Sequence, residues 1–135
     1  MLRGFLSQPV STPSRVQTSA SDVQGRHFYQ NRALTELFGY ATAAELQAAG
    51  GGSAVVKDPQ VAKEMFESIM DGDSWANELE MVTKSGRVFP AYERADAVKD
   101  NEGNLIGLIG IITDITERKL AEEKIAASEA ELRAL

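Results

Sequence analysis

The feature that most constrains the fold is a buried-strand pattern followed at once by a helical pattern near the C-terminal end. Residues 105–112 are Leu and Ile apart from two glycines, which favours a strand over a helix. Residues 120–135 are rich in Ala and Glu and contain no Gly or Pro, which predicts a helix. The short segment between them contains Asp114-Ile115-Thr116-Glu117-Arg118-Lys119 and has no flexible linker. A rearrangement of the core strand would therefore be passed to the helix.

The rest of the chain alternates between short strand and helix patterns. Periodicity and turn residues predict strands over 15–22, 26–30, 75–82, 87–98 and 105–112, and helices over 33–38, 42–49 and 58–71. The second helix opens with the capping-box pattern Thr42-Ala43-Ala44-Glu45, and a flexible loop is expected at 50–52. Asp58-Pro59 opens the longest of these helices. The predicted order is two strands, short helices, a longer helix and a three-stranded meander.

Composition excludes several function classes. The formal net charge of -6 argues against a nucleic-acid partner, because phosphate binding needs clustered Lys and Arg. The absence of cysteine excludes disulfides, thiol catalysis and thiolate metal sites. No apolar stretch approaches the roughly 20 residues of a membrane span, and residues 1–6 are too short for a signal peptide. We expect a cytoplasmic segment without membrane contact.

The sequence offers little for catalysis or metal binding. The single histidine, His27, lies in a predicted strand, and no nucleophile triad or phosphate-binding loop can be built around it. Glu78 and Glu80 fall on a predicted solvent face and are interpreted as solubilising charges. Asp71-Gly72-Asp73 lacks the later ligands of a calcium loop. We predict no catalytic residues and no metal site, so the segment is not expected to be an enzyme.

A set of short motifs occurs in a characteristic order. They are Asp22-x-x-Gly25-Arg26, Tyr29-x-Asn31, Phe38-Gly39-Tyr40, Trp75-x-x-Glu78, Lys84-Ser85-Gly86, Asp100-x-x-Gly103 and the segment 114–119. In order and spacing, residues 15–119 resemble the PAS domain, the sensory-box family found in histidine kinases, cyclic-dinucleotide enzymes and transcriptional regulators.

The resemblance implies an α+β fold: a five-stranded antiparallel sheet with short helices on one face, a ligand cavity between them, and a helix leaving the last strand. The implied organisation is a linker or cap over 1–14, a PAS-like domain over 15–116 and a signalling helix over 117–135. The parent would be a bacterial-type signalling protein with an effector in cis, such as a two-component sensor histidine kinase, a diguanylate cyclase or a phosphodiesterase. The first strand is more polar than is usual in the family.

Two cofactors known in similar domains are not expected here. Flavin-binding light sensors of the family use a cysteine, which this chain lacks, and a glutamine where it has Ile112. Met81 and Ala91 stand at positions resembling their flavin-contacting asparagines. Haem sensors supply an axial histidine from the longer helix, where Met65 and Met70 would be weak ligands. The expected ligand, if one binds, is an unidentified small molecule.

The walls of the implied cavity follow from strand parity. The predicted lining residues are Met65, Ile69, Asn77, Leu79, Met81, Phe89, Ala91, Glu93, Leu108, Gly110 and Ile112. Glu93 is the anomaly, because a buried carboxylate is costly without a partner. It points to a cationic or hydrogen-bonding ligand, or to an internal partner such as His27 or Arg94. A bulge that turns Glu93 to solvent is the open alternative.

The exit helix carries a predicted dimer seam. Ala121, Ile125, Ser128, Leu132 and Leu135 recur at spacings of four and three, as in a short coiled coil. Asp114, Thr116 and Arg118 are predicted to relay the signal, with Asp114 and Arg118 forming an i, i+4 ion pair. The resulting hypothesis is a sensory and dimerisation module that reports on its cavity through a homodimeric helix pair. A structural interaction module without a ligand is the alternative.

Overall fold

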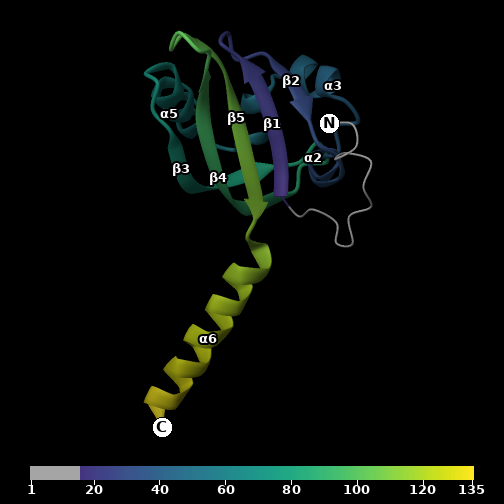
Figure 1. Cartoon of the computed structure of the whole chain (residues 1–135). Helices are drawn as coiled ribbons and strands as arrows, with labels where there is room; N and C mark the ends of the chain where they lie inside the picture. The colour runs from purple at the N-terminus through teal and green to yellow at the C-terminus, as the bar shows by residue number, and fades with distance from the viewer. Residues whose placement is uncertain (1–15) are drawn as a thin grey trace, which may run out of the picture.

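Five strands form one antiparallel sheet in the computed structural model, which describes residues 16–135. They are β1 Val16–Asp22, β2 His27–Gln30, β3 Trp75–Val82, β4 Val88–Lys99 and β5 Leu105–Asp114. The order across the sheet is β2-β1-β5-β4-β3, so the first strand pairs with the last (Figure 1). The predicted α+β class is confirmed. The expected linker over 1–14 lies outside the described residues.

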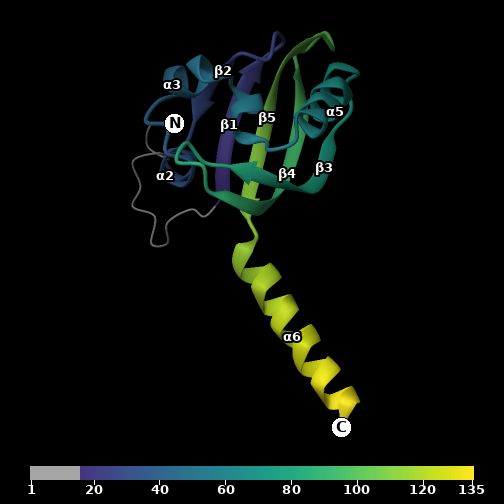
Figure 2. The ribbon, with the colours of Figure 1, turned by 180° about the vertical axis from the view of Figure 1, so that it is seen from behind.

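Short helices connect β2 to β3 and cover one face of the sheet, which is turned toward the viewer in Figure 2. They are α2 Arg32–Phe38, α3 Ala43–Ala48, α4 Gly52–Val55 and α5 Pro59–Met70. The predicted caps form: the Thr42 hydroxyl accepts from the Glu45 N–H, and the Asp58 carboxylate accepts from the Gln60 N–H.

The loop expected at 50–52 is shorter than predicted. Gly51 has a φ of 65°, which an L side chain rarely adopts, and the helical turn α4 starts at Gly52. Val55, at the end of that turn, is buried in the core. Burial of this valine favours a helical turn where glycine content alone indicated a loop.

Two of the sequence motifs prove to be hydrogen-bonded anchors. The side chain of Asn31 accepts from the N–H groups of Thr18 and Leu34 and donates to the Val16 carbonyl, which ties α2 to β1. The Asp22 carboxylate accepts from the N–H groups of Gln24 and Arg26, which closes the turn into β2. The family motifs therefore mark joints between elements.

The core lies between the sheet and the helices. Its largest fully buried side chains come from two helices and two strands: Phe38, Phe89, Leu34, Ile69 and Met81. The rings of Phe38 and Phe89 pack in a tilted arrangement with centroids 5.6 Å apart. These contacts hold the helices against β3 and β4.

Helix α6, Thr116–Ala134, projects away from the sheet and its short helices (Figure 1). It begins one residue before the predicted boundary at 117, so Ile115 alone separates β5 from it. Among residues 16–135, no helix combines the length and the apolarity needed to cross a bilayer.

Candidate functional site

A small cavity lies between the helices and the inner face of the sheet, with a volume of about 60 Å³. Its wall is apolar on the helix side and polar on the β1 side. The lining residues are Ser19, Ser21, His27, Leu34, Phe38, Leu46, Gly52, Val55, Val56, Met65, Glu93, Leu108 and Ile112. We call this space the inner cavity.

The polar wall results from strand register. Ser19 and Ser21 lie two residues apart on β1 and therefore share a face, and Ser21 is paired with His27 of β2. Across β5, Gly110 lies opposite Ser19 and has no side chain to fill the gap. The polarity of the first strand, which departs from the family pattern, is therefore what lines the cavity.

Glu93 is the most unusual group of the cavity. Its side chain comes from β4 and is only 5% exposed, and its Oε1 is buried without a hydrogen-bond partner. Burial raises the pKa of Glu93 to about 7, because the charged form loses its hydration. The carboxyl group therefore changes charge close to neutral pH.

Neither predicted partner of Glu93 pairs with it. The Arg94 guanidinium bonds to Asp96 on the outer face of the sheet. The Gln30 amide nitrogen donates to the Thr35 hydroxyl and to the Tyr40 carbonyl. The Gln30 amide oxygen can only accept, so it accepts from His27 Nε2 over a distance of 2.9 Å. The alternative of His27 or Arg94 as an internal partner is wrong, because both side chains bond elsewhere. The alternative of a bulge that turns Glu93 to solvent is also wrong, because β4 stays in register at this residue.

A wider groove opens beside the inner cavity, and we call it the outer groove. It has a volume of about 400 Å³ and runs between α5, the Gly25 turn and the start of α4. The two spaces share Ser21, Gly52, Met65 and Leu108 as wall residues. The remaining wall of the groove includes Phe66, Ala62 and Pro59 of α5, with Lys63 beside them. The inner cavity therefore adjoins a largely apolar groove.

The predicted lining residues fall into three groups: those at the inner cavity, those packed in the core, and one exposed residue. Met65, Glu93, Leu108 and Ile112 line the inner cavity, and a side chain on Gly110 would meet Glu93 Oε2 at 2.9 Å. Five are packed in the core and line neither the inner cavity nor the outer groove: Ile69, Leu79, Met81, Phe89 and Ala91. Strand parity identified the correct face but not the position of the empty space on it.

Asn77 corrects the predicted wall. It lies opposite Glu93 in the β3–β4 register, yet its side chain is exposed and accepts from the N–H of Glu78. β3 is an edge strand, so a polar side chain at this position can turn to solvent.

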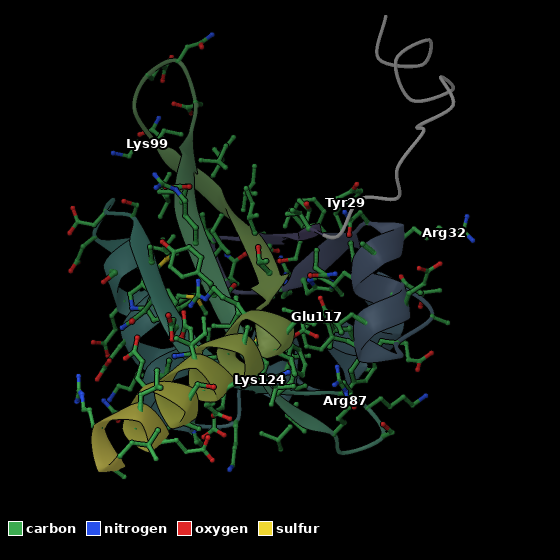
Figure 3. The ribbon with its side chains drawn as sticks, turned by 90° about the horizontal axis from the view of Figure 1, so that it is seen from below. Tyr29, Arg32, Arg87, Lys99, Glu117 and Lys124 are labelled. Carbon is green, nitrogen blue, oxygen red and sulfur yellow. The ribbon has the colours of Figure 1, made fainter. Side chains whose placement is uncertain are left out.

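The joint between β5 and α6 is held by short polar contacts and one buried side chain. Asp114 Oδ1 accepts from both the N–H and the hydroxyl of Thr116, and Asp114 Oδ2 lies 3.4 Å from the Arg87 guanidinium. Ile115 is buried and its N–H donates to the Pro90 carbonyl. Figure 3 views this end of the molecule, with Arg87 and Glu117 labelled. Asp114 and Thr116 are thus in direct contact at this joint.

Glu78 clamps the first turn of α6 to the edge strand. Its carboxylate bonds to Arg118 at 2.6 Å and to Lys119 at 2.7 Å, and these contacts lower the pKa of Glu78. The predicted Asp114–Arg118 pair is wrong because Asp114 belongs to β5 and not to the helix. The interpretation of Glu78 as a solubilising charge is also wrong. The role of Glu78 depends on the position of α6 beside β3, and the alternating pattern of a strand carries no information about that position.

The predicted seam residues of α6 are all exposed, namely Ala121, Ile125, Ser128, Leu132 and Leu135. Leu132 is 70% exposed and Ile125 is 59% exposed. The helix thus presents unpaired apolar side chains beyond its first turn.

Searches for similar proteins return structures of sensory domains. The structure of a PAS domain of a protein from Colwellia psychrerythraea is 20% identical, with a TM-score of 0.64 and coverage of 77% of this chain and 89% of that one. A sensory box histidine kinase/response regulator from Burkholderia thailandensis is also 20% identical, with a TM-score of 0.61 and coverage of 90% and 92%. An RNA-binding Light-Oxygen-Voltage receptor is 23% identical, with a TM-score of 0.73, and this chain spans 39% of its length. No curated protein matches at a significant level.

Another similar structure is a Light-Oxygen-Voltage domain studied with a flavin analogue. The residues present here do not fit a flavin. Met81 and Ala91, at the positions that resemble flavin contacts, are fully buried in the apolar core. Within residues 16–135 no three His, Asp or Glu side chains gather as a metal site would require.

The model of one protein family, the PAS domain, matches residues 18–117. This range covers the sheet from the third residue of β1 onward, the helices over its face and the joint with α6. PAS domains are generally sensory and not catalytic. The chain belongs to the PAS domain family.

Proposed function

We propose that this domain senses the state of its inner cavity and passes that state through β5 and α6 to an effector in the same protein. The observation that supports this most strongly is the continuity of the path. Leu108 and Ile112 of β5 line the cavity, and the same strand reaches α6 across the single residue Ile115. Because Ile115 is buried and Glu78 holds the next turn, a shift of β5 would move the helix as one body.

Helix α6 would act on the effector as half of a parallel helix pair. Its seam residues are exposed and follow the spacing of a coiled coil, and a partner helix would remove them from water. Ala121 and Ser128 are small, so the seam is weak over these two heptads. A weak seam suits a coupler, because it can change register or crossing angle at low energetic cost.

The effector we propose is of the kind found with sensory boxes in bacterial signalling, such as a histidine kinase or a cyclic-dinucleotide enzyme. The similarity to a sensory box histidine kinase/response regulator supports the first class. We place the domain in the cytoplasm, where such effectors act.

The relay can be tested in a fusion of this chain, through Leu135, to a reporter kinase that responds to an incoming coiled coil. Glu93→Gln changes the cavity charge and should change kinase output several-fold at pH 8. Two glycines inserted after Thr116 should abolish that difference, because the joint can no longer transmit the shift. The same insertion in the exposed turn after Asn101 should leave it intact.

Two results would contradict the proposal. One is that the difference in kinase output between wild type and Glu93→Gln persists at full size when two glycines are inserted after Thr116. The other is a fusion that sediments as a monomer while it retains full regulation.

A structural interaction module without a ligand is the second candidate. The small volume of the inner cavity favours it, since about 60 Å³ holds no more than a few water-sized groups. A domain of this kind would show neither ligand binding nor dependence of α6 on the charge of Glu93.

A further inference from the structure

The inner cavity presents a buried carboxyl group without a counter-charge. Glu93 Oε1 has no partner, and no Lys or Arg lines the cavity. The other titratable side chain on the wall, His27, uses Nε2 for Gln30. An ionised carboxylate in these surroundings is costly until a cation reaches it. Any ligand that enters with a positive charge therefore gains from this group.

Two oxygens converge on the space over Gly110. Glu93 Oε2 and Ser19 Oγ each lie 2.9 Å from the point where a Cβ on Gly110 would sit, so the two oxygens flank the same glycine. Both side chains also line the inner cavity, so a nitrogen there with several N–H donors has two oxygen acceptors on its wall. A primary ammonium group has three donors and fits this arrangement. A volume of about 60 Å³ admits such a group with a short stem but excludes a bulky quaternary ammonium.

The outer groove suits an apolar body attached to that head. It adjoins the inner cavity at Met65 and Leu108, and α5 contributes Phe66, Ala62 and Pro59 to its wall. Its volume of about 400 Å³ lies within the usual range for small-molecule sites. Lys63, beside the groove, disfavours a second positive charge on the ligand.

We propose that the inner cavity and outer groove together bind a primary monoamine with an apolar body, with its ammonium group between Glu93 and Ser19 and its body along α5. The proposal rests on the sensory function and names the chemical class of its ligand. Occupancy would place a charge against β4 and β5, the strands that lead to α6.

The test uses n-hexylamine as the probe, with n-hexanol and hexanoate as controls of matched length and different charge. Calorimetric titration of the chain at pH 8 should show hexylamine binding at least tenfold more tightly than either control. Glu93→Gln and Ser19→Ala should each weaken hexylamine binding, the first by at least tenfold. Glu64→Gln is the matched control, because Glu64 is an exposed residue of α5 that lines neither space.

Equal affinity for hexylamine and hexanol, or full hexylamine affinity in a folded Glu93→Gln variant, would overturn the proposal. So would the absence of hexylamine binding. The outcome is separable from that for the relay. Hexylamine binding that leaves the position of α6 unchanged would uphold the ligand class and contradict the relay. If α6 responds to the charge of Glu93 but the domain does not bind hexylamine, the relay would be upheld and the ligand class contradicted.

Discussion

Replacing Phe89 with alanine is expected to lower the free energy of unfolding by about 3–5 kcal/mol. Phe89 is 2% exposed and packs against Phe38, and the Arg87 guanidinium lies 4.9 Å from the centre of its ring. Truncation would leave a cavity in the layer between helices and sheet that surrounding side chains cannot fill. Urea unfolding followed by circular dichroism measures the change.

Phe28→Ala provides the matched control. Phe28 lies on β2 and is 64% exposed, so the same truncation there should change stability by less than about 0.5 kcal/mol. A loss below about 1 kcal/mol for Phe89→Ala would contradict the assignment of Phe89 to the core. Phe89 would then again be a candidate for the wall of the inner cavity.

Replacing Glu93 with glutamine is expected to stabilise the domain increasingly as pH rises. The unfolded carboxyl has the ordinary pKa of 4.5 and the folded one has a pKa of about 7. Below pH 4.5 both states are protonated and the difference contributes nothing. Between pH 4.5 and 7 only the unfolded state ionises, so the wild type loses stability as pH rises. Above pH 7 the loss levels off at about 3 kcal/mol.

The relevant quantity is the difference in unfolding free energy between Glu93→Gln and wild type, measured from pH 4 to pH 8.5. Subtraction cancels the titration of other carboxylates, such as Asp22 and Asp100, whose pKa values are lowered by hydrogen bonds from backbone N–H groups. Glu64→Gln should give a flat difference, because Glu64 is exposed. A flat difference for Glu93→Gln would show that the carboxyl group keeps its ordinary pKa in the folded state, as a solvated group does.

Much of the fold could be predicted because local patterns and tertiary structure agree. The period changes from helical to alternating near Trp75, which separates α5 from the meander. Gly39 ends α2 with a φ of 86°, and Asp58-Pro59 opens α5, as their residue types predict. The error at α4 arose because burial of Val55 outweighs the glycine content before it.

The site was less predictable, because empty space depends on how the helices lie across the sheet. Parity placed Glu93 and Phe89 on the same inner face, but only Glu93 borders the cavity. Ser19 and Ser21 were missed, although their alternation on a strand of unusual polarity was a usable signal. Glu78 was misread because its partners belong to α6, far along the chain.

The central claim is that α6 is held rigidly by the sheet and moves with the cavity. Double electron–electron resonance between nitroxides at Tyr29→Cys and Ala127→Cys tests it directly, and the chain has no native cysteine to interfere. Both sites are exposed, and dilution with unlabelled chain isolates distances within one molecule. Glu78→Gln should broaden the distance distribution. Glu80→Gln is its control, since Glu80 faces Lys57 instead of α6.

The account predicts one narrow distance in the wild type, whose mean shifts between pH 5.5 and pH 8.5 and stays constant in Glu93→Gln. A broad wild-type distribution, or a mean distance that ignores the charge of Glu93, would contradict it.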